Sequence, residues 1–216
     1  MLISLTILVA YLVGAIPFGI IISRIFGIKD IRNEGSGDIG AANVWRVAGY
    51  KAAVWVFIAD IGKGAVAILM AETAYNNLNL SFHSLDLFLA ICGAAVVIGH
   101  IFPVFLKFKG GKGANTTLGV AAALLPIHSI ICFSVFLIVL FITKYVSLGS
   151  MIGATVLSLG LAFEKFILGH DVSNVYLVMT SILTVLVIVA HRKNISRIIS
   201  GNEKVFSLSS KTGSGS

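Results

Sequence analysis

Residues 85–106 read LDLFLAICGAAVVIGHIFPVFL, an apolar run with a single acidic side chain, Asp86, near its start and His100 near its end. A helix that crosses a bilayer needs about 20 predominantly apolar residues, so this run predicts a transmembrane helix. Comparable apolar runs cover residues 2–22, 52–70, 117–125, 127–143, 148–163 and 175–190. The chain is therefore predicted to be an all-α membrane protein with about seven transmembrane helices.

The composition points to the same class. The chain has 216 residues, of which 57% are hydrophobic and only 12% charged, whereas soluble domains are about 45–50% apolar and about 25% charged. The net charge of +7 is typical of the basic cytoplasmic loops of a polytopic protein, so we expect the lipid bilayer and no nucleic acid as partner. Cys92 and Cys132 lie in separate apolar runs without metal-ligand spacing, so no disulfide, metal site or cofactor is expected.

The basic residues predict the orientation. Of the 16 Lys and Arg, 14 fall after the first, third and fifth runs or in the tail, and Lys and Arg in short loops mark the cytoplasmic side. The N-terminus is therefore expected outside and the C-terminus in the cytoplasm. Around Pro126 two runs are each short for a full span, which predicts a pair of short helices or a re-entrant hairpin. Residues 1–206 are expected to form one polytopic domain; 207–216 (SLSSKTGSGS) form a low-complexity tail that we exclude from the fold.

The first polar island is GSGDIGAANVWR (35–46). It contains a GxGxxG match, but a dinucleotide fingerprint needs a strand before it and a helix after it, and this match follows a predicted membrane helix. Glycines that expose backbone N–H groups before a helix still favour an anion, and Ser36, Asn43 and Arg46 add donors. The alternative is a flexible cytoplasmic loop.

The second island, DIGKG (60–64), lies inside an apolar run. A charge at the centre of a membrane helix costs about 2.5–3.5 kcal/mol on insertion scales, and the i,i+3 partner Asp60 offsets only part of this cost. Lys63 is therefore expected to face a polar interior that accepts a ligand. A buried ion pair that locks helices together is the alternative.

The third island runs from Gly99 to Thr116 and contains GGKG at 110–113. It is no Walker A loop, because Leu106 stands where GxxxxGK[ST] requires the first glycine and Gly113 follows the lysine. Lysines and glycines at the start of a helix nevertheless favour phosphate at a membrane interface. His100 is a candidate general base, with a structural histidine as the alternative, and Lys107 is assigned to topology alone.

Together the islands resemble the bacterial acyl-phosphate:glycerol-3-phosphate acyltransferases, the PlsY family. The resemblance rests on GSGDIGAANVWR (35–46), DIGKGAVA (60–67) and GHIFPVFLKFKGGKGANTTLG (99–119), with support from YVSLGS (145–150) and HRKN (191–194). Asp38, Ala42 and Asn115 depart from the family pattern, in which Asn, Thr and Ala are commoner at these positions.

The resemblance implies transfer of a fatty acyl group from acyl phosphate to sn-glycerol 3-phosphate, giving lysophosphatidic acid and inorganic phosphate, the first acylation step of phospholipid synthesis. It implies a site on the cytoplasmic face of the bacterial inner membrane and a soluble enzyme that supplies acyl phosphate. With the residue patterns above, it assigns catalysis to Ser36, His100 and Lys109. The predicted phosphate-binding residues are Gly37, Gly40, Asn43, Arg46, Lys63, Gly110, Gly111, Lys112, Asn115, Thr116, Ser147 and His191.

Two other functions fit the sequence less well. Glycerolipid acyltransferases with an HxxxxD pair are excluded, because the residues five after each histidine are Phe88, Phe105, Phe133, Val175 and Ser196. An organophosphate transporter would suit the intramembrane Lys63 and the glycine-broken helices, but most polar residues gather on one side. The sequence leaves two alternatives for the base that accepts the proton of the attacking hydroxyl, His100 and a phosphate oxygen of a substrate.

Overall fold

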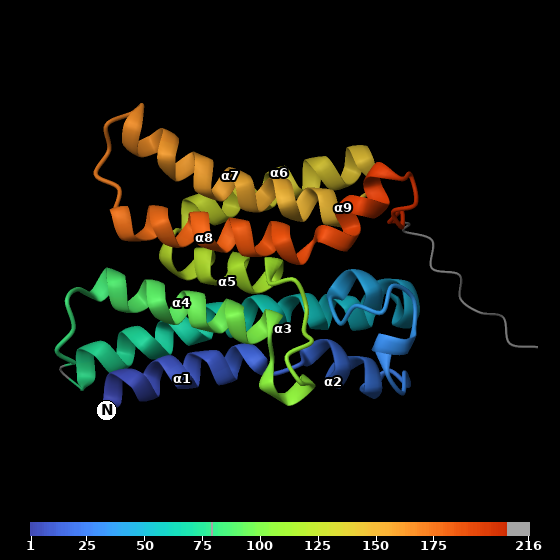
Figure 1. Cartoon of the computed structure of the whole chain (residues 1–216), viewed down its shortest axis with the longest axis horizontal. Helices are drawn as coiled ribbons and strands as arrows, with labels where there is room; N and C mark the ends of the chain where they lie inside the picture. Colours follow the sequence, from blue (N-terminus) through green and yellow to red (C-terminus); the bar gives the residue numbers. More distant parts are fainter. Residues whose placement is uncertain (79, 207–216) are drawn as a thin grey trace, which may run out of the picture.

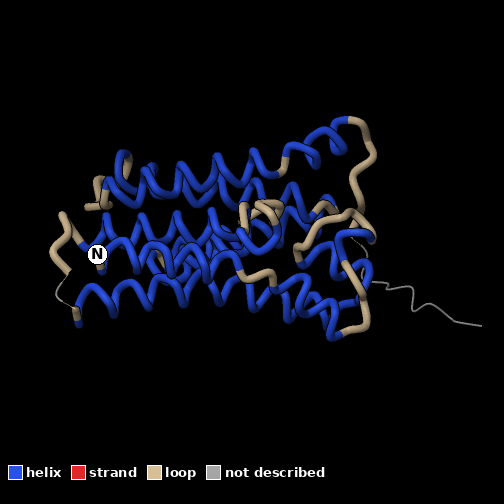
Figure 2. Tube along the Cα trace, turned by 60° about the horizontal axis from the view of Figure 1, so that its bottom comes forward, coloured by secondary structure: helices blue, strands red, loops and turns tan. Residues whose placement is uncertain are grey.

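The computed structural model describes residues 1–78 and 80–206, and all regular elements in these ranges are helices (Figures 1 and 2). The predicted all-α class is therefore confirmed, while the predicted tail 207–216 lies outside the described residues. The α-helices are α1 (Leu2–Ala15), α2 (Phe18–Ile25), α3 (Ala41–Asn77), α4 (Leu85–Ile101), α5 (Ala114–Leu124), α6 (Pro126–Thr143), α7 (Val146–Phe166), α8 (Asn174–Ala190) and α9 (Arg192–Ile199). Two 3-10 turns, η1 (Ile31–Asn33) and η2 (Val104–Leu106), lie in the connections.

Five segments of the described chain are long and apolar enough to cross a membrane: Leu2–Ile25, Ala41–Asn77, Leu85–Leu106, Pro126–Thr143 and Val146–Phe166. Helices α8 and α9 form a sixth candidate if the pair, bent by 57°, is one span. The remaining predicted run is α5, whose 11 residues extend only about 16 Å at 1.5 Å per residue.

The break at Pro126 lies where the sequence predicts it. Pro126 is the first residue of α6, where its missing N–H costs no intrahelical hydrogen bond. The prediction that both flanking helices are short holds for α5 only, because α6 has 18 residues. Two other breaks occur. Pro17, inside the predicted run 2–22, separates α1 from α2, and Gly49, just before the predicted run 52–70, kinks α3 with a φ of 84°.

Small residues allow the helices to approach closely. A Cβ on Gly14 of α1 would lie 2.0 Å from the carbonyl oxygen of Val96 in α4, and one on Gly119 of α5 would lie 2.0 Å from that of Ile61 in α3. Such close backbone approach is the usual way in which membrane helices pack, because lipid gives no hydrophobic drive between them. Buried side chains from α3, α4 and α8, including Ile68, Phe88 and Leu183, fill the space between these pairs.

The connections that carry the first and third polar islands lie on the side of the bundle away from the N-terminus. The loop between α2 and α3 and the loop between α6 and α7 lie there with α9, and the loop between α4 and α5 lies nearer the middle of the bundle, whereas the N-terminus and the α7–α8 connection lie at the opposite end (Figure 1). The second island lies within α3 and meets the third where Asp60 faces His100, so the fold brings the islands together.

Candidate functional site

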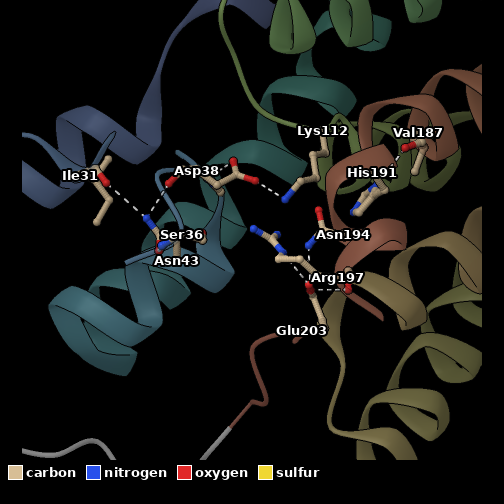
Figure 3. A network of polar contacts seen from close by, with 12 residues as sticks. Ile31, Ser36, Asp38, Asn43, Lys112, Val187, His191, Asn194, Arg197 and Glu203 are labelled. Carbon is tan, nitrogen blue, oxygen red and sulfur yellow. Dashed lines mark hydrogen bonds and ion pairs between the residues drawn. The ribbon is translucent and has the colours of Figure 1, made fainter. Parts of the chain in front are cut away.

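A cavity of about 290 Å³ opens among these connections. Its polar wall includes Ser36, Asp38, Arg46, Lys112, Ser147, His191, Asn194 and Arg197, and its apolar wall includes Ala53, Val54, Phe57, Phe133, Phe136, Leu137 and Leu140. Figure 3 shows Lys112 between Asp38 and His191, with Arg197 and Glu203 nearby. Cations and apolar side chains thus share one cavity, which suits a ligand that is anionic at one end and aliphatic at the other.

Asn43 organises the loop that precedes α3. The side chain is 1% exposed, and its Nδ2 lies 3.2, 3.0 and 2.8 Å from the carbonyl oxygens of Ile31, Glu34 and Asp38. Its Oδ1 accepts the backbone N–H of Ser36 at 2.6 Å (Figure 3). Because these groups are committed to the backbone, Asn43 positions Ser36 at the cavity. Its side chain is not free for the phosphate-binding role that the sequence predicted.

Lys112 enters the cavity from the loop before α5 and forms an ion pair with Asp38 (Figure 3). The other carboxylate oxygen of Asp38 accepts the backbone N–H of Gly40 at 3.1 Å. Burial by itself would raise the pKa of Asp38, but the charge and hydrogen bond of Lys112 outweigh it and lower the pKa. Asp38 is therefore ionised at neutral pH.

The glycines of the GGKG segment pack against His100. The backbone N–H groups of Gly110 and Gly111 donate to the carbonyl oxygens of Ile101 and His100, both at 3.1 Å. A Cβ on Gly111 would lie 2.2 Å from Nε2 of His100, so no larger residue fits. These two glycines shape the loop that carries Lys112, and their N–H groups are not free for a phosphate.

Lys63 forms the buried ion pair that the sequence left as an alternative. Its Nζ lies 2.8 Å from Oδ1 of Asp60 and donates to the carbonyl oxygen of Ile16 at 3.2 Å, beside the break between α1 and α2. The lysine and the aspartate are 5% and 2% exposed. Nδ1 of His100 lies 3.5 Å from the same aspartate oxygen, a Coulombic contact at the limit of hydrogen-bond distance. Lys63 thus acts on the site through Asp60 and not by contact with the cavity.

Glu203 holds the other wall of the cavity. Its Oε1 accepts from Ser147 Oγ and Asn194 Nδ2, both at 2.7 Å, and its Oε2 from Arg197 Nε at 2.9 Å. Burial would raise the pKa of Glu203, but these hydrogen bonds outweigh it and lower the pKa. The next residue, Lys204, accepts a hydrogen bond from Arg46 on its carbonyl oxygen at 3.0 Å. The segment after α9 therefore ties α7, α9 and the start of α3 together.

Three buried polar atoms on residues of this cavity wall have no hydrogen-bond partner among the described residues. They are Nε of Arg46, Nδ1 of His100 and Oδ1 of Asn194. Buried polar atoms are normally hydrogen-bonded. His191 complements them, because its Nδ1 contacts the carbonyl oxygen of Val187 at 2.8 Å, which places the proton on Nδ1 and leaves Nε2 as an acceptor.

The structure brings most of the predicted site residues together. Those that line the cavity are Ser36, Gly40, Asn43, Arg46, His100, Lys112, Asn115, Ser147 and His191. Those outside its lining are Gly37, Lys63, Lys109, Gly110, Gly111 and Thr116. Lys109 is exposed, so its predicted catalytic role has no support from its position.

Charged or polar residues of the cavity that were given no site role from the sequence include Asp38, Asp60, Asn194, Arg197 and Glu203. Asn194 belongs to the HRKN segment that contributed to the resemblance, but no role was assigned to it. Glu203 is the only acidic residue after Asp171. An isolated carboxylate within a basic segment is the signal that could have identified Glu203.

This fold and this cavity define an integral membrane protein with a site for an anionic, partly aliphatic substrate. The family model described as Glycerol-3-phosphate acyltransferase matches residues 4–201, and the chain belongs to this family. It is thus an acyltransferase, and the predicted family and enzyme class are confirmed.

Similar proteins cover nearly the whole chain. The glycerol-3-phosphate acyltransferase of Syntrophotalea carbinolica is 42% identical over 200 residues, covering 92% of this chain and 95% of the relative. That of Bacillus velezensis is 40% identical over 203 residues, covering 94% and 97%.

Solved structures give the same result. The crystal structure of PlsY (YgiH), an integral membrane glycerol 3-phosphate acyltransferase, in the glycerol 3-phosphate form has a TM-score of 0.81 at 36% identity, covering 95% of this chain and 96% of that chain. The lysophosphatidic acid form has a TM-score of 0.79 at 34% identity, with the same coverage.

Proposed function

We propose that this acyltransferase uses acyl phosphate as its donor and sn-glycerol 3-phosphate as its acceptor, on the cytoplasmic face of the bacterial inner membrane. The observation that carries the proposal is the shared cavity, in which Arg46 and Lys112 face the same space as Phe57, Phe133 and Phe136. Both substrates carry phosphate, and the donor also carries an aliphatic chain. A soluble enzyme would supply the donor, because acyl phosphate is a reactive mixed anhydride.

The reaction needs few protein groups. The hydroxyl oxygen of glycerol 3-phosphate attacks the acyl carbonyl carbon, the bond from that carbon to the phosphate oxygen breaks, and phosphate leaves with the electron pair. The hydroxyl proton passes to a phosphate oxygen or to a nearby base. Cations at the leaving phosphate stabilise the charge that develops there, which is the role we give to Lys112 and to the unpartnered Nε of Arg46. The buried acceptor Oδ1 of Asn194 suits a glycerol hydroxyl.

Product analysis of the purified protein tests this proposal. Radiolabelled glycerol 3-phosphate is offered with acyl phosphate, acyl-CoA or acyl-carrier protein, each with and without a chelator of divalent cations. We expect lysophosphatidic acid from acyl phosphate alone and unchanged turnover with the chelator, since lysines and amides form the site. Turnover with acyl-CoA or acyl-carrier protein in place of acyl phosphate would refute the proposed donor.

A further inference from the structure

Asp38 and Lys112 form an ion pair inside the cavity. The side chains are 16% and 26% exposed, so both remain within reach of a ligand. The carboxylate is held in place by the loop, since its other oxygen accepts the N–H of Gly40 and its backbone carbonyl accepts from Asn43 at 2.8 Å. The pair is therefore part of the cavity wall, and the protein itself supplies an anion to Lys112.

The other two carboxylates of the cavity wall are already neutralised by partners of their own. Asp60 pairs with the buried Lys63, and Glu203 is bound by Arg197, Ser147 and Asn194. Asp38 differs from both because its cation is the lysine to which we assign a substrate phosphate. A bound phosphate would therefore share Lys112 with this carboxylate.

A carboxylate and a phosphate on one ammonium group repel each other. Lysine has three N–H donors, so it can contact both anions. Like charges a few ångströms apart nevertheless disfavour each other in a site that is partly shielded from water. Burial would raise the pKa of Asp38, but Lys112 outweighs it and lowers the pKa, so protonation does not relieve this repulsion at neutral pH.

We propose that Asp38 acts as the resident counter-ion of Lys112 and weakens the binding of phosphate groups there. This inference rests on the proposed function, since it requires Lys112 to bind a substrate phosphate. The consequence is a site that binds free phosphate weakly. A substrate that also contributes a glycerol or acyl portion is held by further contacts, whereas the product phosphate leaves readily.

Asp38→Asn is the matched variant. The amide has the shape of the carboxylate and its Oδ1 can still accept the N–H of Gly40, but it carries no charge to compete for Lys112. We expect the KM for glycerol 3-phosphate and the inhibition constant of inorganic phosphate each to fall about 3- to 10-fold, the size of a partly screened charge interaction. The gain should shrink as salt is raised.

The experiment measures both constants in the wild type, Asp38→Asn, Lys112→Met and the double variant, in a double-mutant cycle. We expect Asp38→Asn to have little effect when Lys112 is already methionine. Asp38→Ser, whose hydroxyl can also accept from Gly40, repeats the test if the amide disturbs the loop, and thermal unfolding reports folding.

The outcomes separate the two proposals. If Lys112→Met raises the KM while Asp38→Asn and Asp38→Ser leave both constants unchanged or raise them, the counter-ion role is wrong and the proposed function stands. Loss of turnover in folded Asp38→Asn would overturn the counter-ion role in favour of a catalytic one. If Lys112→Met changes neither constant, the phosphate-binding role of Lys112 fails, and the counter-ion role with it.

Discussion

The His100 side chain is enclosed by protein groups on both sides of its ring. Nδ1 faces Asp60 at 3.5 Å, and Nε2 lies so close to Gly111 that a Cβ there would be 2.2 Å away. The backbone carbonyl of the same residue accepts the N–H of Gly111. These contacts favour a histidine that orients the Lys112 loop over one that removes the substrate proton.

Replacing His100 distinguishes these two roles. Gln keeps a hydrogen bond but cannot accept a proton at neutral pH, so we expect His100→Gln to retain much more activity than His100→Ala. A general base would make the two variants about equally slow, within the ~10²–10⁴-fold range of such catalysis. The measurement is kcat/KM with a pH–rate profile. A near-neutral acidic limb that disappears in His100→Gln at unchanged KM would show that His100 is the base.

The three lysines of the third island differ in position, and we expect their variants to differ accordingly. Lys112 lines the cavity, whereas Lys107 and Lys109 are exposed. Lys112→Ala should lower kcat/KM on the order of 10²-fold or more, as with the loss of other charge-stabilising donors. Lys107→Ala and Lys109→Ala should change it only a few-fold. Equal losses in Lys109→Ala and Lys112→Ala would restore the catalytic role that the sequence suggested for Lys109.

At the scale of elements, two glycines allow the loop before α5 to pack closely against the end of α4. Gly110 and Gly111 return the chain onto the last turn of α4, where a Cβ would collide with the carbonyl oxygen or the ring of His100. In contrast, a Cβ on Gly62 of α3 would meet nothing within 4 Å. Gly111 and Gly62 can therefore be compared to test whether the packing around a glycine determines the effect of replacing it.

We expect Gly111→Ala to lower kcat/KM at least 10-fold, because the added methyl displaces the His100 ring or the Lys112 loop. Gly62→Ala should leave activity unchanged and stabilise α3 by roughly 0.5–1 kcal/mol, the usual difference between Gly and Ala within a helix. Enzyme assays and thermal unfolding of both variants provide the comparison. Wild-type kcat/KM in Gly111→Ala would contradict the contact with His100.

Helix boundaries were predictable where hydropathy decides them. The run 85–106 contains α4, because its apolar residues must leave water. The run 52–70 underestimated α3, which begins at Ala41, because Asn43, Arg46 and Lys51 continue the helix beyond the apolar segment. The break at Pro17 was not predicted, since its neighbours are as apolar as the rest of the run.

The membership of the site was easier to predict than the role of each residue. Residue type and spacing indicated anion binding for Arg46 and Lys112, which line the cavity. Asn43 has the same donor chemistry but binds carbonyl groups of Ile31 and Glu34. The partners of Asn43, Gly111 and Glu203 depend on how the loops meet in space, and local sequence does not contain that information.

For the whole molecule, the number of crossings depends on α5. Its length of about 16 Å is about half of a 30 Å hydrocarbon core. If α5 and α6 each lead from one side toward the other, seven segments place the two termini on opposite sides. If the pair enters and leaves on one side, five crossings remain and the termini still lie on opposite sides. If α5 and α6 together make a single crossing, six crossings place the termini on the same side. The distribution of basic residues favours either of the first two arrangements over the third.

Cysteine labelling in intact cells and in inverted vesicles separates the third arrangement from the first two. Cys92 and Cys132 are buried, so an impermeant thiol reagent should give little background. We expect Lys29→Cys, Lys107→Cys and Lys193→Cys to react only from the cytoplasm, and Asn77→Cys and Asp171→Cys only from outside, because all five positions are exposed at the ends of the helices. Reaction of Lys193→Cys from outside while Lys107→Cys reacts from the cytoplasm would show that the α5–α6 pair does not follow the predicted crossings. It would also place the HRKN segment across the membrane from the Lys112 loop, which the shared cavity forbids, so we expect the two cysteines to react from the same side.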